Sequence, residues 1–186
     1  MSIYTKKGDK GETKVFDKKT GELIKIRKDA CKIEVIGSID ELNSFLGIIK
    51  SHSDDTQPSS MSNHQSTVEE IQENLFTINS ILAGSKLTFT KTKTTKLEKE
   101  IDKWEKILPV QKNFIYYGGS KEASLIFFAR AIARRAERSL VTFAKTEKTP
   151  EAILMYFNRL SDYLFILGRV VNNEEGIKER FWKTSK

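Results

Sequence analysis

The stretch Ala129-Arg130-Ala131-Ile132-Ala133-Arg134-Arg135-Ala136-Glu137-Arg138 decides the fold of this chain. At 100° per residue of a helix, Arg130, Arg134 and Arg138 fall within an arc of roughly 80°, with Glu137 beside them. A solvated helix face normally mixes lysine, glutamate, serine and glutamine, whereas this face carries guanidinium groups, each of which offers phosphate two fixed donors. The stretch therefore predicts a helix that presents an anion site, or else an ion-pair network at a surface or between subunits.

A second polar stripe lies nearer the C-terminus, in Asn158-Arg159-Leu160-Ser161-Asp162-Tyr163-Leu164-Phe165. Helical periodicity places Asn158 and Asp162 on one face with Arg169. The opposite face holds the apolar residues Ile153, Phe157, Leu160, Leu164, Leu167 and Val171. Two such helices predict an anion site built on a helical bundle, although Asn158 and Asp162 could equally be core polar residues satisfied by backbone groups or by Arg169.

The rest of the chain is expected to supply three more helices. The first three helices of the chain open at the capping boxes Ser38–Glu41, Thr67–Glu70 and Thr95–Glu98. The third stops before Pro109, the fourth spans about 120–146, and the fifth runs from Pro150 to about 174.

These elements predict an all-α fold, a five-helix antiparallel bundle within a single domain over residues 1–186. Residues 1–37 are expected to form a non-helical arm with short β-like pieces, such as residues 32–36. Residues 51–66 are expected to form a flexible polar loop.

Composition limits the class of protein. A chain of 186 residues suits one domain, and its formal charge of +7 fits an anionic ligand such as a nucleotide, a nucleic acid or an acidic membrane surface. Since Cys31 is the only cysteine, no intramolecular disulfide can form and a reducing compartment is expected. No apolar run approaches the roughly 20 residues that span a bilayer, and the N-terminus resembles neither a secretory nor a transit signal. A cytoplasmic protein is expected.

Catalysis by a protein nucleophile or by zinc is not expected. The two histidines, His52 and His64, both fall in the polar loop, and Cys31 stands alone. Ser-His-Asp, Cys-His and zinc sites therefore lack their residues. Any catalysis must depend on positioning and electrostatics.

The N-terminal arm, residues 4–14, combines two glycines three apart with lysines and threonines. Gly8 and Gly11 let the backbone present amide donors at close range, which suits a polyphosphate. The spacing is not that of a Walker motif, because no Gly-Lys-Ser/Thr follows. A flexible basic tail is the alternative explanation.

Four segments together resemble the propanediol-utilisation type of ATP:cob(I)alamin adenosyltransferase. They are residues 4–13, the segment Gly37-Ser38-Ile39-Asp40-Glu41-Leu42-Asn43-Ser44, residues 129–138 and residues 158–165. They occur in the family's order and spread over nearly the whole chain. One loop departs from the family, which commonly has Phe-Ile-Leu-Pro-Gly-Gly where this chain has Phe114-Ile115-Tyr116-Tyr117-Gly118-Gly119.

The resemblance implies a homotrimer of five-helix bundles with ATP at each subunit interface. It implies ATP contacts at Thr5, Lys6, Lys7, Gly8, Thr13, Lys14, Lys28, Arg134, Arg135, Glu137, Arg138 and Asn158. It further implies an Asp–Arg pair that bridges subunits beside the corrinoid, here Asp40 and Arg130. An aromatic residue that pushes away the lower axial ligand of cobalt would be Phe114. Residues expected to act in catalysis are thus Arg134, Arg130, Asp40 and Phe114.

The expected function is transfer of the 5′-deoxyadenosyl group of ATP to the cobalt of reduced cob(I)alamin, with release of triphosphate. ATP is the co-substrate, Mg²⁺ accompanies it, and a reductase and a cobalamin-dependent acceptor enzyme are the implied partners. Two alternatives stay open. One is a basic helical-bundle module that binds nucleic acid or an acidic protein without chemistry, and the other is a carrier or sensor that binds adenosylcobalamin.

Overall fold

The computed structural model describes residues 4, 6–17, 20–55 and 64–183, with the backbone alone for residues 52–55. In chain order the elements are β1 (Glu12–Phe16), β2 (Leu23–Arg27), α1 (Cys31–Asp55), α2 (Gln65–Ala83), α3 (Thr92–Glu105), α4 (Lys121–Phe143) and α5 (Glu151–Glu174). The expected five-helix fold is confirmed, and its N-terminal arm contains a small antiparallel sheet of two strands.

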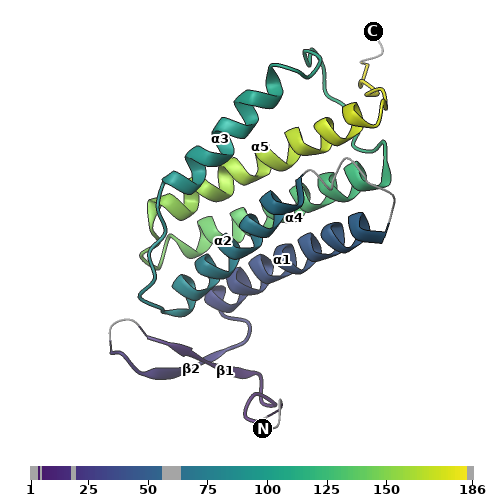
Figure 1. The fold of residues 1–186 in the computed structure, drawn as a ribbon. Coiled ribbons are helices and arrows are strands. Elements are labelled where there is room, and N and C mark those ends of the chain that lie inside the picture. Colours follow the sequence, from purple (N-terminus) through teal and green to yellow (C-terminus); the bar gives the residue numbers. More distant parts are fainter. Residues whose placement is uncertain (1–3, 5, 18–19, 56–63, 184–186) are drawn as a thin grey trace.

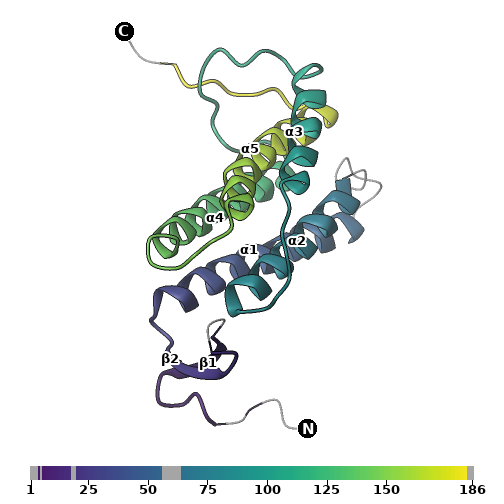
Figure 2. The same ribbon diagram turned by 90° about the vertical axis from the view of Figure 1, so that its left-hand side faces the viewer.

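The helices pack side by side, and the hairpin lies beyond one end of the bundle (Figures 1 and 2). Helix α4 packs against α5 and α1, α3 packs against α5, and α1 packs against α2. The hairpin joins the bundle at the start of α1 (Figure 1). This arrangement leaves one side of α4 and of α1 without a neighbouring helix.

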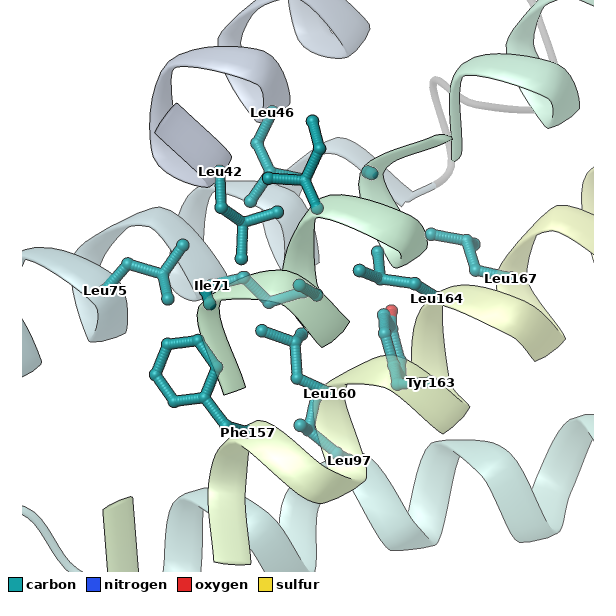
Figure 3. Close-up of a cluster of buried hydrophobic side chains, with 14 of the residues drawn as sticks. Leu42, Leu46, Ile71, Leu75, Leu97, Phe157, Leu160, Tyr163, Leu164 and Leu167 are labelled. Carbon is teal, nitrogen blue, oxygen red and sulfur yellow. The ribbon is translucent and has the colours of Figure 1, made fainter. Parts of the chain in front are cut away.

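The core is built from leucine, isoleucine and aromatic side chains that recur at three- and four-residue spacing. Figure 3 shows side chains from α1, α2, α3 and α5 meeting there, among them Leu42, Ile71, Leu97 and Leu160. All four are at most 4 % exposed. Burying a side chain of this kind stabilises the fold by roughly 1.5–3 kcal/mol. The packed core therefore makes α4 and α5 a rigid support for polar residues on their outer faces.

Helix α1 begins seven residues earlier than expected. The predicted capping box at Ser38 is wrong, because the Ser38 hydroxyl is buried inside the helix and donates to the carbonyl of Val35 over 3.0 Å. The predicted β-like piece at residues 32–36 is also wrong, since Val35 is a fully buried residue of α1. Asp40 consequently lies about two and a half turns inside the helix, too far from its start for the helix dipole to explain it.

The other predicted capping boxes are also wrong. Helix α2 starts at Gln65 and α3 at Thr92, and both helices lack a side-chain cap. Glu70 instead pairs with Lys96 of α3, and Glu98 pairs with Arg159 of α5. These glutamates therefore tie helices together rather than start them.

The polar loop expected over residues 51–66 is shorter than predicted. Helix α1 continues to Asp55 and α2 begins at Gln65, and residues 56–63 lie outside the described part of the chain. His64 is buried, with its Nε2 3.4 Å from a carboxylate oxygen of Glu174 and its ring edge-on to Trp104. The side chain of His52 lies outside the described residues.

The two helices that carry the predicted site have nearly the expected bounds. Ser120 caps α4 with its hydroxyl oxygen, which accepts from the amide of Ala123 over 3.0 Å. Helix α5 begins directly after Pro150 and ends at Glu174.

Candidate active site

The N-terminal hairpin brings together several of the predicted phosphate contacts. Thr13 and Lys14 lie in β1, and the amide of Lys28 donates to the carbonyl of Gly11 over 2.8 Å just beyond β2. A Cβ placed on Gly8 would lie 3.3 Å from the Nζ of Lys28. Gly8 and Lys28 are therefore close neighbours at the open end of the hairpin.

The residues before the hairpin present their charges outward. Lys6 has a left-handed backbone, with φ of 58°, and its Nζ lies 5.9 Å from the centroid of the Tyr4 ring. Lys6, Lys7 and Lys14 are exposed. Thr5 lies outside the described residues.

Arg130 lies between two aromatic rings, those of Tyr117 and Phe165, which we call the aromatic clamp. Its guanidinium carbon is 5.2 Å from the centroid of the Tyr117 ring and 5.4 Å from that of Phe165. Its Nη1 donates a hydrogen bond to the hydroxyl of Tyr117 over 3.1 Å. Within the described residues, the arginine is therefore held by π-face contacts and one hydrogen bond rather than by a carboxylate.

The next arginines along α4 separate into two groups. Arg134 and Arg138 are exposed, and Arg138 donates from Nη1 to the backbone carbonyl of Arg134 over 3.1 Å. Arg135 points toward α1, where it forms an ion pair with Glu41. Arg135, which is not one of the three residues of the predicted stripe, thus forms the ion pair, while Arg134 and Arg138 have no carboxylate partner in the described part of the chain.

Asn158 lies level with these residues on the adjoining helix. Because α4 and α5 are antiparallel and Arg130 contacts Phe165, a step of seven residues along each helix places Asn158 level with Glu137. Asn158 is exposed and Glu137 is half-buried. We call Arg130, Arg134, Glu137 and Asn158 the α4–α5 face.

The predicted stripe of Asn158, Asp162 and Arg169 is wrong as a unit. Asp162 pairs with Arg159, with 2.6 Å between Nη1 and a carboxylate oxygen. Arg169 is buried and binds the carboxylate of Glu179 and, over 2.8 Å, the carbonyl of Pro109. Of these three residues, only Asn158 therefore belongs to the candidate site. Arg169 instead connects α5 to the chain after that helix and to the loop before α4.

The loop before α4 holds Phe114 with its ring outward. The ring is 75 % exposed, yet the Phe114 carbonyl accepts from the amide of Trp182 over 2.7 Å. Two residues on, the amide of Tyr116 donates to the carbonyl of Arg180 over 2.9 Å, and the Arg180 guanidinium lies 4.0 Å from the centroid of the Tyr116 ring. Tyr116 and Tyr117 of the same loop are also exposed, and a group of exposed apolar side chains is typical of a binding surface.

The end of the same loop is fixed by Asn172. Its Nδ2 donates to the carbonyl of Gly118 over 2.8 Å, and its Oδ1 accepts from the amide of Ser120 over 3.0 Å. Gly119, with φ of 114°, lies so close that an added Cβ would be 2.1 Å from the Asn172 Oδ1. Asn172 was not among the predicted site residues, and its only signal in the sequence is an amide that directly follows Val170 and Val171.

Asp40 and Arg130 do not meet within one chain. Asp40 is exposed on α1 and has no ion pair in the described part of the chain, while Arg130 lies in the aromatic clamp on the side of α4 that faces α5. The predicted pair therefore depends on a second copy of the chain.

The hairpin and the α4–α5 face are also separate within one chain. A cavity of about 830 Å³ lies between the hairpin and the bundle, lined by Val15 and Ile26 of the hairpin and by Phe143 of α4, and none of the predicted ATP contacts lines it. Arg134 lies about 13 Å along α4 from Phe143. The two groups of predicted phosphate contacts, on the hairpin and on α4, are therefore not brought together around this cavity.

The resolved pKa shifts of tyrosines belong to the core. Burial raises the pKa of Tyr156, against a hydrogen bond from Asn74, and burial likewise raises the pKa of Tyr163. Among the described residues there is no group of three or more metal-binding side chains, and no helix there is long and apolar enough to cross a membrane.

Comparison with known proteins gives one consistent result. Residues 3–171 match the family model described as cobalamin adenosyltransferase. The corrinoid adenosyltransferase of Bacillus subtilis is 40 % identical over 181 residues, which cover 95 % of this chain and 90 % of that protein.

Solved structures agree with the sequence match. A variant of the PduO-type ATP:corrinoid adenosyltransferase from Lactobacillus reuteri, complexed with cobalamin and ATP, superposes with a TM-score of 0.90 at 33 % identity, covering 100 % of this chain and 98 % of that chain. Another variant of the enzyme, complexed with ATP, gives a TM-score of 0.87 at 34 % identity, covering 97 % and 100 %. The chain therefore belongs to the cobalamin adenosyltransferase family.

Proposed function

We propose that this protein transfers the 5′-deoxyadenosyl group of ATP to the cobalt of a reduced corrinoid and releases triphosphate. The observation that carries the proposal is the pairing of two exposed arginines on α4 with a backbone-fixed, outward aromatic residue, Phe114, in the loop before the same helix. The arginines suit an anionic leaving group, and the aromatic residue suits a flat apolar ligand. Both relatives compared above are named for this reaction.

The reaction needs no protein nucleophile. Cobalt(I) donates an electron pair to C5′ of ATP, the bond between C5′ and its oxygen breaks, and that oxygen leaves with the triphosphate while cobalt becomes cobalt(III). The protein must hold C5′ near cobalt and neutralise the charge on the departing oxygen. Arg134 and Arg138 are suited to the second task, since neither guanidinium has a carboxylate partner in the described part of the chain.

The phosphate site is completed by a second copy of the chain in a homotrimer. This proposal is supported by the separation of the hairpin from Arg134 and by the absence of an Asp40 partner within the described residues. The exposed sides of α1 and α4 also carry Ile48 and Phe128, which are 53 % and 57 % exposed, and apolar side chains of this size favour a buried contact. Sedimentation of the purified protein should give three times the monomer mass, and a monomer would contradict the assembly.

The hairpin then closes on the triphosphate of a neighbouring subunit's site. Lys6, Lys7, Lys14 and Lys28 supply positive charge, and the backbone near Gly8 supplies amide donors. Mg²⁺ fits this arrangement because it binds substrate phosphates with few protein ligands. Glu137 is the one carboxylate of the α4–α5 face.

The corrinoid lies against Phe114. A ring held beneath the corrin excludes the lower axial ligand and water, which leaves cobalt(II) four-coordinate and easier to reduce. Asp40 and Arg130 from adjoining subunits flank this position. The loop departure at Tyr116 and Tyr117 does not displace the Phe114 backbone from its hydrogen bond with Trp182.

A nucleic-acid-binding function is less well supported. Of the four arginines on α4, Arg135 is paired with Glu41 and Arg130 lies in the aromatic clamp, so the helix lacks a continuous basic stripe. Binding to nucleic acid would weaken steeply with salt and accept many polyanions. A saturable preference for ATP over polyanions separates the two functions.

The proposed reaction is tested by mixing protein, ATP, Mg²⁺ and chemically reduced cobalamin without oxygen. Absorbance should report cobalt–carbon bond formation, with one triphosphate released for each bond formed. Saturable binding of both substrates without any cobalt–carbon bond would overturn the enzymatic proposal in favour of a carrier or sensor.

A further inference from the structure

Tyr117 contacts Arg130 in two ways at once. The Arg130 guanidinium carbon lies 5.2 Å from the centroid of the Tyr117 ring, and Nη1 donates to the Tyr117 hydroxyl over 3.1 Å. The Phe165 ring of α5 makes a second contact with Arg130, with 5.4 Å between the ring centroid and the guanidinium carbon. The guanidinium therefore has its orientation fixed by two rings and its rotation fixed by one hydrogen bond.

The Tyr117 ring is itself held in place. It packs 5.3 Å from Phe127 of α4 and 6.4 Å, edge-on, from Phe165, measured between ring centroids. The next residue, Gly118, is fixed through its carbonyl by Asn172. Both the ring and the backbone of this loop thus have their own supports, so Arg130 docks against a preformed surface.

The clamp leaves part of the Arg130 guanidinium free to bind a further acceptor. Nη1 is bonded to Tyr117, and Nε is buried without an acceptor in the described part of the chain. A guanidinium has five N–H donors in a fixed plane, so the second donor of Nη1 and the two of Nη2 remain for an acceptor from outside the chain. A buried donor with no acceptor is costly, and the clamp contacts offset that cost.

We infer that Tyr117 is a positioning residue that locks Arg130 and so fixes the direction in which its remaining N–H donors point toward an acceptor supplied from outside the chain. This inference rests on the proposed function, in which Arg130 acts beside the corrinoid together with Asp40 of a neighbouring subunit. Tyr117 acts through Arg130 and need not touch substrate. Tyr117 thus supplies, from the loop before α4, a hydrogen-bond acceptor for Arg130.

A first experiment tests, without any substrate, whether Tyr117 restrains the Arg130 guanidinium. In nitrogen-15 NMR spectra of the protein, rotation of the Arg130 guanidinium about its Nε–Cζ bond should be slow. Tyr117→Phe keeps the ring but removes the acceptor, and it should make that rotation faster. Tyr116→Phe is the matched control, because Tyr116 contacts Arg180 and not Arg130. Equal rotation rates in all three proteins would overturn the inference.

A second experiment connects the lock to the reaction. Tyr117→Phe should weaken cobalt(II)alamin binding in the presence of ATP about tenfold, the scale of one hydrogen bond to a charged group, and should leave the KM for ATP unchanged. The variant should keep the thermal stability of the Tyr116→Phe control. A loss of the same size in both variants, or a changed KM for ATP alone, would contradict the positioning role.

The Arg130→Ala background separates the two proposals. If Tyr117 acts through Arg130, Tyr117→Phe should add no further loss of cobalt(II)alamin binding to the Arg130→Ala protein. An additional tenfold loss of cobalt(II)alamin binding in the Arg130→Ala protein would show that Tyr117 does not act through Arg130, and the proposed function would stand. If Arg130→Ala itself binds cobalt(II)alamin normally, the proposed corrinoid-side role of Arg130 fails, and the reaction-linked part of this inference fails with it.

Discussion

The amide of Trp182 donates a hydrogen bond to the carbonyl of Phe114 over 2.7 Å. This contact joins the chain beyond α5 to the loop in front of α4. The same C-terminal segment holds Glu179, which forms a buried ion pair with Arg169, and Arg169 also donates to the carbonyl of Pro109. The C-terminal segment is thereby part of the structure that places the Phe114 ring.

Breaking that ion pair should destabilise the protein. The two side chains are 5 % and 11 % exposed, and removal of one partner from a buried pair leaves an uncompensated charge, at a cost of about 3–5 kcal/mol. Glu179→Ala should therefore lower the free energy of unfolding by this amount in urea titrations.

The exposed pair of Lys91 with Glu151 provides the control. Lys91→Ala should change the unfolding free energy by less than about 1 kcal/mol. Similar losses for the two variants would show that Arg169 and Glu179 do not act as a buried pair.

Gly119→Ala should move the loop. The new Cβ would lie 2.1 Å from the Asn172 Oδ1, at a φ of 114° that side chains rarely adopt, so the loop or Asn172 must shift. Corrinoid binding should weaken while ATP binding is retained, as measured by titration of each ligand. Gly37→Ala, where an added Cβ meets nothing within 4 Å, is the matched control, and equal corrinoid affinity in the two variants would argue against a required loop position.

Arg134→Ala should slow the reaction. Loss of one preorganised donor to a developing negative charge typically costs on the order of 10²–10³ in rate. Turnover at saturating corrinoid checks this, with Lys145→Ala as a control that removes one exposed positive charge beyond the end of α4. Near-normal turnover and ATP affinity in Arg134→Ala would remove this residue from the ATP site.

The N-terminal arm should be protected by nucleotide. Lys6, Lys7 and Lys10 are exposed, and closure of the arm on triphosphate would hide these lysines from trypsin. Cleavage within residues 6–14 should slow when ATP and Mg²⁺ are added, as followed by mass spectrometry. Cleavage at the same rate with and without ATP would count against a closing arm.

The periodicity of apolar residues predicted the parts of the fold that depend on burial. The spacing of apolar residues in α4 and α5 placed both helices close to their observed bounds, because one face of each must meet the core. Capping patterns failed at Ser38 and Thr95, where the hydroxyl bonds back to a carbonyl of the preceding turn, and at Thr67, whose predicted partner Glu70 pairs with another helix.

The candidate site was only partly predictable for a related reason. The placement of Arg134 and Arg138 on one exposed face of α4 was predictable, because helix geometry alone sets their spacing, whereas the sequence left open whether they bind an anion or form ion pairs. The partners of Arg135 and Arg169 come from α1 and from the chain after α5, and a sequence pattern within one helix carries no information on such distant contacts. Asn172 was missed for the same reason.

The coordination of cobalt tests the central claim most directly. Electron paramagnetic resonance of cobalt(II)alamin should show a four-coordinate signal when wild-type protein and ATP are present, because the Phe114 ring excludes the lower ligand. Folded Phe114→Ala protein should lose this signal and keep its ATP affinity. A four-coordinate signal of undiminished intensity in the Phe114→Ala protein would contradict the account.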